Sequence, residues 1–414
     1  MLTEIRYFLS DVVYWVRTHL LASALGALVV AAAVVGIVLL VGGGDDDGTG
    51  EAPAPRVLVR EVEAPERAED LGFPAFATKN TTRVAGPDPI ANAAAVALAA
   101  YPSTGGVEGP DAVTIVDVEQ WQAGIAAASL VADPVGAPIL FSQDGELPEL
   151  TENAIAALAP AGSPDTDGRQ IFAVGAAARP DGFDTAELEG GNPAALAAEI
   201  ERLRAQLTGP PQHIVVTTSA DPAIAMPAAG WAARSGDPIL FVDEGGVPEA
   251  TAKALGRNKN VPVYVLGDRK TIPSEVMDEI KKIARTVERI GAEDPVENAI
   301  EFARAASGSF GWNINDPGHG FVIVNAERPG DAAAAAPLSA GGSWGPLLVT
   351  TEAGRLPDPL RGYLLDLKPG YETDPTRAVY NHVWLIGDDE AISVNVQAQI
   401  DDLAEVAPVR SGAG

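Results

Sequence analysis

The chain has 414 residues, of which 47% are hydrophobic and 21% are charged, with a formal net charge of −29 and no cysteine. The absence of cysteine excludes disulfides and thiolate metal or redox sites. The negative charge argues against nucleic acid as a partner and against docking on an anionic membrane surface, because both need a basic face.

The N-terminal region contains an apolar stretch long enough to span a membrane. Residues 20–41 carry no charge, and a helix of this length crosses the roughly 30 Å hydrocarbon core of a bilayer. Basic residues precede the stretch and Asp45–Asp47 follow it. The positive-inside preference therefore predicts a single-pass anchor in the cell membrane, with residues 1–19 as a short cytoplasmic or interfacial segment and the bulk of the chain outside.

An acidic tether is predicted next, at residues 42–71. This segment is Gly-rich, then acidic, then rich in Ala and Pro. It offers little apolar surface to bury, so we expect it to be extended or disordered.

A short apolar run recurs along the rest of the chain. Gly136–Phe141 returns as Gly236–Phe241 and, more loosely, as Gly345–Val349. Each run is predicted to be a buried strand, because a turn signal precedes it. Each is followed by a proline and an acid, which together indicate the start of a helix. These steps are Leu147–Glu149, Val247–Glu249 and Leu356–Asp358.

The recurring runs divide the chain into three predicted repeats of alternating strands and helices. Repeat 1, residues 72–181, has predicted strands at 83–85, 112–116, 139–141 and 171–175 and helices at 90–100, 121–132 and 149–158. Repeat 2, residues 182–284, has strands at 213–217, 239–241 and 263–267 and helices at 194–207, 223–233 and 274–284. Repeat 3, residues 285–407, has strands at 321–325, 347–349 and 383–387 and helices at 296–306, 332–340 and 390–403, before a tail at 408–414.

Apolar strands that alternate with helices indicate parallel sheets covered on both faces. We therefore expect the α/β class, with three tandem open parallel-sheet sandwiches of about 100 residues each after one transmembrane helix. The Ala-rich helices would allow close helix approach where neighbouring units pack.

No catalytic or cofactor motif is apparent. The sequence has no nucleophile elbow, phosphate-binding loop or dinucleotide fingerprint. The four histidines are far apart and none has metal-ligand spacing. We therefore predict that the protein is not an enzyme and needs no cofactor or metal.

The repeat resembles the cell wall-binding repeat 2 family of surface proteins. Its opening turn is matched by Arg83–Gly86 with Asp88, and by Arg289–Ile290 with Asp294. Pro329–Ala332 and Pro337–Leu338 match its helix, and Gly136–Leu140 matches its Gly-Ala-Pro-Ile-Leu strand. The resemblance covers roughly residues 72–407 and includes all three closing strands.

The resemblance implies a pseudo-threefold arrangement of the three repeats and non-covalent binding of an anionic wall polymer. The chain departs from the family where Pro89 and Pro295 replace an arginine and where Glu187 replaces the opening arginine. Two functions therefore stay open. One is a membrane-anchored envelope protein that binds a cell-wall polysaccharide or anionic polymer, bridged by divalent cations. The other is a scaffold or partner-binding protein whose repeats have lost that affinity. The oligomeric state is left undetermined.

Arg83, Asp88, Arg289, Asp294 and Asp331 are the candidate polymer-binding residues. An arginine here could recognise a phosphate or carboxylate bidentately. The alternative is an Arg–Asp pair that fastens the opening turn to its own or the next unit. Asp331 could equally cap a helix.

Three tryptophans also have two interpretations. Trp121, Trp231 and Trp344 lie near the recurring strands. They could stack on sugar rings, or they could pack in the core or between units.

Overall fold

The computed structural model describes residues 76–101, 109–342 and 344–409. All of them belong to the second of two compact units, Glu63–Gly414. The predicted membrane span at 20–41, with its flanking segments at 1–19 and 42–71, lies outside the described residues, as does the end of the tail at 410–414. Within the described ranges, no helix has both the length and the apolar character needed to cross a membrane.

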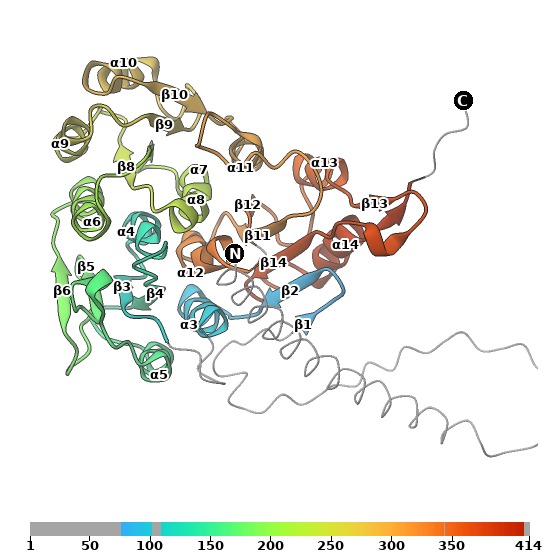
Figure 1. The fold of residues 1–414 in the computed structure, drawn as a ribbon, viewed down its shortest axis with the longest axis horizontal. Coiled ribbons are helices and arrows are strands. Elements are labelled where there is room, and N and C mark those ends of the chain that lie inside the picture. Colours follow the sequence, from blue (N-terminus) through green and yellow to red (C-terminus); the bar gives the residue numbers. More distant parts are fainter. Residues whose placement is uncertain (1–75, 102–108, 343, 410–414) are drawn as a thin grey trace, which may run out of the picture. The chain divides into compact units, whose positions relative to one another are not determined.

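Three parallel sheets organise the described residues (Figure 1). The first sheet has the order β6(Thr185–Leu188), β5(Ile171–Val174), β3(Val113–Asp117), β4(Ile139–Ser142). The second has the order β10(Val287–Ile290), β9(Val263–Leu266), β7(Ile214–Thr218), β8(Ile239–Val242). The third has the order β2(Thr81–Val84), β14(His382–Ile386), β11(Gly320–Asn325), β12(Leu347–Thr350), with β1(Phe76–Ala77) antiparallel to β2 at its edge. A separate pair joins β13(Gly370–Tyr371) and β15(Ala407–Pro408).

Helices connect and cover these strands. They are α3(Pro89–Ala100), α4(Trp121–Ala127), α5(Glu149–Leu158), α6(Pro193–Thr208), α7(Pro222–Ala225), α8(Pro227–Ser235), α9(Glu249–Arg257), α10(Ser274–Ile283), α11(Pro295–Arg304), α12(Pro329–Ala340), α13(Asp358–Asp366) and α14(Val394–Ala404), with the 3-10 turns η1(Ala128–Leu130), η2(Pro164–Thr166) and η3(Pro375–Arg377). The predicted α/β class with parallel sheets is confirmed.

The proline-acid steps start helices as predicted. Pro148, Pro248 and Pro357 are the N-cap residues of α5, α9 and α13. Each of these helices begins with an acidic residue, which lies at the positive end of the helix. The recurring apolar runs lead into β4, β8 and β12, and all residues of these three strands are buried.

Each sheet takes its fourth strand from across a predicted repeat boundary. β6, at the start of predicted repeat 2, pairs with β5 of the first sheet. β10, at the start of predicted repeat 3, pairs with β9 of the second sheet. β2 pairs with β14, about 300 residues later in the chain. The sequence predicted three self-contained sandwiches of one segment each. The three sheets differ from that prediction, because each contains a strand from a neighbouring or distant segment. The difference arises because an edge strand needs only a neighbouring backbone, which any adjacent segment can supply.

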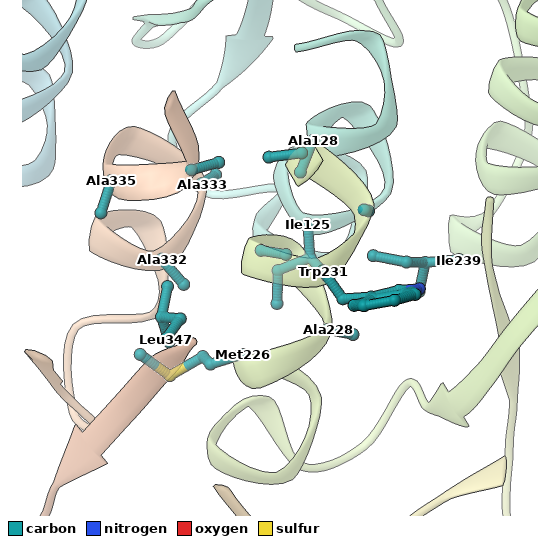
Figure 2. Close-up of a cluster of buried hydrophobic side chains, with 14 of the residues drawn as sticks. Ile125, Ala128, Met226, Ala228, Trp231, Ile239, Ala332, Ala333, Ala335 and Leu347 are labelled. Carbon is teal, nitrogen blue, oxygen red and sulfur yellow. The ribbon is translucent and has the colours of Figure 1, made fainter. Parts of the chain in front are cut away.

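The helices between the sheets form a common core. α12 packs against α3, α4 and α8, and α8 also packs against η1. Figure 2 shows Ala332 and Ala333 of α12 on one side of α8, and Ala128 of η1 on another. A Cβ at Gly124 would lie 3.1 Å from the Cβ of Ala333. Small side chains therefore bring these helices close together, as the Ala-rich segments predicted.

Candidate functional site

Arg83 lies inside the third sheet rather than on the surface. Only 3% of the residue is exposed. Nη1 donates to the carbonyls of Gly387 at 2.8 Å and Asp388 at 2.9 Å, and Nε donates to Oε1 of Gln397 at 2.8 Å. Burial lowers the pKa of the guanidinium, and Asp389 and Asp388 oppose this effect. Arg83 therefore fastens β2 to the loop after β14.

Arg289 repeats this arrangement in the second sheet. Nη1 donates to the carbonyls of Gly267, at 2.7 Å, and of Asp268, and Nη2 donates to the carbonyl of Ile272 at 2.7 Å. Desolvation again lowers the pKa of the guanidinium. The carbonyls belong to the loop after β9, as the Arg83 partners belong to the loop after β14. The structural alternative is therefore the one that the geometry supports, but the acceptors are main-chain carbonyls and not the aspartates of the opening turns.

The first sheet lacks this contact. Glu187 of β6 stands where the other two sheets have the arginine, and it pairs in register with Ala173 of β5. Its carboxylate instead forms an exposed ion pair with Arg179. The crevice between the loops after β3 and β5 is open there, with a volume of about 410 Å³, and Gln120, Gly175 and Gly190 are among its lining residues.

The three candidate aspartates are engaged within the fold. Oδ1 of Asp88 accepts from the N–H of Ala91 at 2.8 Å and caps α3. Oδ1 of Asp294 accepts from the N–H groups of Val296 and Glu297 and caps α11. Both residues therefore satisfy free N–H groups at the start of a helix.

Asp331 is fully buried and does not cap its helix. The N-cap of α12 is Arg328, and Oδ1 of Asp331 accepts from Nδ2 of Asn92 on α3 at 2.8 Å. Oδ2 lies 2.9 Å from Nε of Arg328, an ion-pair contact without hydrogen-bond alignment. Burial raises the pKa of this carboxyl to about 6, while Arg328 and Asn92 act to lower it. The residue therefore links two helices instead of serving as a cap.

The structure does not bring the five candidate residues together into one exposed site. Arg83, Asp88 and Asp331 surround the loops at the end of the third sheet, whereas Arg289 and Asp294 belong to the second sheet. Polymer binding by these residues stays a prediction. Asn92, Arg328, Asp388 and Gln397 are the partners that sequence reasoning missed. Asn92 is 239 residues from Asp331 and Gln397 is 314 residues from Arg83, whereas Arg328 is only three residues from Asp331.

An exposed cationic and aromatic surface lies elsewhere, where the central helices end. A cavity of about 200 Å³ is lined by the ends of α3, α8 and α12 and by the residues after η1. The lining residues are Ala100, Tyr101, Val131, Asp133, Ala233, Arg234, Pro337, Ala340 and Gly341. The hydroxyl of Tyr101 donates to the carbonyl of Gly136 at 2.6 Å, and burial raises the pKa of this phenol to about 12.

Arg234 and Trp344 form the rim of this surface. The guanidinium carbon of Arg234 lies 4.6 Å from the centroid of the Trp344 ring. Trp344 is 37% exposed and stacks on Trp312, with ring centroids 6.2 Å apart. Among the described residues, no carboxylate lies within ion-pair distance of Arg234. Nη1 of Arg234 also donates to the carbonyl of Ala340 at 3.4 Å. A guanidinium that has no carboxylate partner and is held against an aromatic ring fits an anionic group carried by a sugar.

The other two candidate tryptophans are core residues. Trp231 is buried, and Trp121 is half-buried with its ring edge against Phe241 at 6.1 Å. Packing is the confirmed interpretation for these two. The sequence offered no signal for Arg234, because its position on the rim depends on where α8 and α12 end together. Within the described ranges, no group of three or more His, Asp or Glu side chains could hold a metal ion.

Comparison with known proteins adds a family for part of the chain. Residues 187–277 match the family Cell wall binding domain 2 (CWB2). This stretch belongs to that family. It begins in β6 and ends in α10, so it lies within residues 182–284 predicted for repeat 2. The family match indicates a cell-wall-associated surface protein. The resemblance inferred from the sequence is confirmed for this stretch, and its extension to all three repeats stays a prediction.

Two solved structures share the fold of the CWB2-containing chain. Cwp8 from Clostridium difficile superposes with a TM-score of 0.61 and 19% identity, over 79% of this chain and 52% of that one. Cwp6 from Clostridium difficile gives a TM-score of 0.61 and 16% identity, over 79% of this chain and 48% of that one. The chain thus spans about half the length of these proteins. No curated protein sequence matches it.

Proposed function

We propose that this is a membrane-anchored cell-envelope protein whose three repeats, in a pseudo-threefold arrangement, bind an anionic wall polymer non-covalently. Residues 20–41 would hold it in the membrane, and residues 42–71 would place the repeats in the wall. The CWB2 match supports the association with the wall. The apolar stretch at 20–41, between basic and acidic flanks, supports the anchor.

The Arg234–Trp344 rim is the observation that carries the binding proposal. It presents a guanidinium, held against the ring of Trp344, next to a cavity that is large enough for one sugar residue. Asp133, which also lines the cavity, would accept hydrogen bonds from sugar hydroxyls. With a net charge of −29, the protein repels an anionic polymer at long range. Divalent cations that bridge the two would reduce this repulsion.

A scaffold function is the second candidate. It is favoured by the internal use of Arg83 and Arg289, whose guanidinium groups donate to main-chain carbonyls of the fold instead of facing a polymer. A protein of this kind would hold its place in the envelope by its anchor and by a protein partner.

Retention on isolated cell walls distinguishes the two candidates. Full-length protein in detergent would be incubated with walls that retain or lack their secondary anionic polymers, at low and high salt, with calcium or with a chelator. We expect retention that needs the polymer and falls at least tenfold in Arg234→Ala and Trp344→Ala. The matched control is Arg257→Ala, which removes an arginine that is already paired with Glu201.

Each outcome decides between the candidates. Polymer-dependent retention that survives in Arg257→Ala and fails in Arg234→Ala supports the binding function at the rim. Equal retention of all variants on walls with and without polymer would overturn polymer binding and leave the scaffold function.

A further inference from the structure

A serine, a histidine and an aspartate form a hydrogen-bonded chain beside the second sheet. Oγ of Ser309 lies 2.9 Å from Nε2 of His213. Nδ1 of His213 lies 3.1 Å from Oδ2 of Asp237. Ser309 is exposed, whereas His213 is 7% and Asp237 is 2% exposed. This is the order of groups and the gradient of burial by which a nucleophilic serine is activated.

The aspartate is held in one orientation. Its Oδ1 accepts from the main-chain N–H of His213 at 3.0 Å, and its Oδ2 accepts from Nε1 of Trp231 at 2.9 Å. Because Oδ2 also faces Nδ1 of His213, the imidazole carries a proton on Nδ1 and leaves Nε2 free to accept the proton of Ser309. The rings of Tyr264 and Phe310 pack against the imidazole at 5.9 Å and 5.5 Å and fix its plane.

The fold does not require this pair of polar residues. His213 and Asp237 face each other at the starts of β7 and β8. The corresponding positions are Ala112 and Ala137 at the first sheet, and Gly320 and Gly345 at the third. Two of the three sheets therefore form with small apolar pairs at this place, and only the second carries a base and its carboxylate.

The turn that carries Ser309 also presents main-chain donors. Ser307 and Phe310 exchange hydrogen bonds through N–H and C=O, and Gly308 has a φ of +64° within this turn. Among the described residues, the N–H groups of Gly308 and Ser309 have no acceptor. Two free N–H groups beside a nucleophile are the donors that a developing oxyanion needs.

We propose that Ser309, His213 and Asp237 form a nucleophilic site that acts on small carboxylic esters. Oγ of Ser309 bonds to the ester carbonyl carbon as its proton passes to Nε2 of His213. The bond from that carbon to the alkoxy oxygen then breaks, and the alcohol leaves with the proton from Nε2. Water next attacks the acyl carbon and gives a proton to Nε2. The bond between the acyl carbon and Oγ of Ser309 then breaks, the proton returns from Nε2 to Oγ, and the carboxylic acid departs.

The substrate class follows from the exposure of the serine. Ser309 lies on an exposed turn whose aromatic neighbours are packed against His213. A short acyl group, such as an acetyl ester borne on an extended chain, reaches Oγ without entering the core. Ser309 and His213 are the catalytic residues, and Asp237 is a positioning residue because it acts through the imidazole.

Labelling of the full-length protein with a fluorophosphonate tests the site. We expect one adduct, located at Ser309 by peptide mapping, and hydrolysis of 4-nitrophenyl acetate that Ser309→Ala abolishes. Ser307→Ala is the matched control in the same turn and should be labelled like the wild type. His213→Ala should be labelled at least about 100-fold more slowly, since a general base contributes about this much.

Chemical rescue separates catalysis from structure. Added imidazole should restore labelling to His213→Ala, which a purely structural histidine would not allow. Asp237→Asn should slow labelling by at least about 100-fold while thermal unfolding shows a folded protein. The double variant His213→Ala with Asp237→Ala copies the pair of the first sheet and should fold but not react. Wild-type labelling no faster than that of Ser309→Ala, or unchanged in His213→Ala, would overturn the proposal.

Discussion

Asn92 and Asp331 are joined by a buried hydrogen bond of 2.8 Å, although 239 residues separate them in the chain. The bond connects α3, in the first predicted repeat, with α12, in the third. Arg83 connects the same two ends of the described chain through Gln397. The first and last segments are therefore fastened to each other, and the third sheet is complete only when the N-terminal strand β2 joins it.

The buried carboxyl of Asp331 should make stability depend on pH. Burial raises its pKa from 3.8 to about 6 in the folded state. Between these values the folded protein holds the proton more firmly than the unfolded chain, so stability falls as pH rises. A rise of this size corresponds to roughly 3 kcal/mol between about pH 4 and pH 7. The variant Asp331→Asn should lack this pH-dependent part of the free energy of unfolding.

Urea unfolding at several pH values measures that difference. The free energy of unfolding of the wild type, minus that of Asp331→Asn, should decrease from pH 4 to pH 7. The contributions of the other carboxyl groups are common to both proteins and cancel in the subtraction. A difference that stays constant, or that increases with pH, would show that Arg328 keeps the carboxylate ionised throughout.

Removal of Arg83 should destabilise the fold strongly. Arg83→Ala leaves the carbonyls of Gly387 and Asp388 without their donor and opens a space in the core. We expect a loss of at least about 3 kcal/mol in the free energy of unfolding. Arg179→Ala is the control, because Arg179 forms an exposed ion pair at the corresponding strand of the first sheet. Its loss should cost less than about 1 kcal/mol. Similar losses in both variants would contradict the fastening function of Arg83.

Glycine in the opening turn should be essential at Gly86. A Cβ there would lie 2.4 Å from Oδ1 of Asn92 and 2.8 Å from its main-chain nitrogen. Gly86→Ala should therefore destabilise the protein by about 2 kcal/mol or more. Gly256→Ala, within α9, meets no atom within 4 Å and should stabilise it by about 0.5–1 kcal/mol. If the backbone at Gly86 approaches Asn92 this closely, thermal unfolding should show a lower melting temperature for Gly86→Ala and a higher one for Gly256→Ala.

The contact between the central helices should not tolerate a larger side chain. Ala333 is 1% exposed, and its Cβ approaches the backbone of α4 at Gly124. Ala333→Leu should cost about 1–3 kcal/mol, because the helices must separate or distort. Ala157→Leu, on the exposed face of α5, should leave the midpoint of urea unfolding nearly unchanged. A tolerated leucine at position 333 would mean that the helices are less closely packed than the structure shows.

Much of the local structure could be predicted because its causes are local. The apolar runs that became β4, β8 and β12 are marked by composition and by the turn before them. The helix starts at Glu149, Glu249 and Asp358 follow from proline and an acid. Motif residues such as Arg83–Gly86 also carried the family resemblance, and the family is confirmed for residues 187–277.

The strand exchange between segments required the tertiary structure. The strands β6 and β10 have no strong alternation of apolar and polar residues, and each pairs across a predicted boundary. Their pairing is decided by which backbone edge lies within hydrogen-bond distance, and that depends on the packing of all the helices.

The sites divide in the same way. Sequence alone singled out the five candidate polymer-binding residues, because each is recognised by its place in a short motif. These are Arg83, Asp88, Arg289, Asp294 and Asp331. The sequence could not tell that Arg83 is buried, that Asp331 bonds to Asn92, or that Ser309 meets His213, because these contacts join residues far apart in the chain. Amino-acid order determined the elements and the family of one segment. Only the packing of those elements decided which polar side chains are buried and hydrogen-bonded inside the fold and which are exposed at the surface.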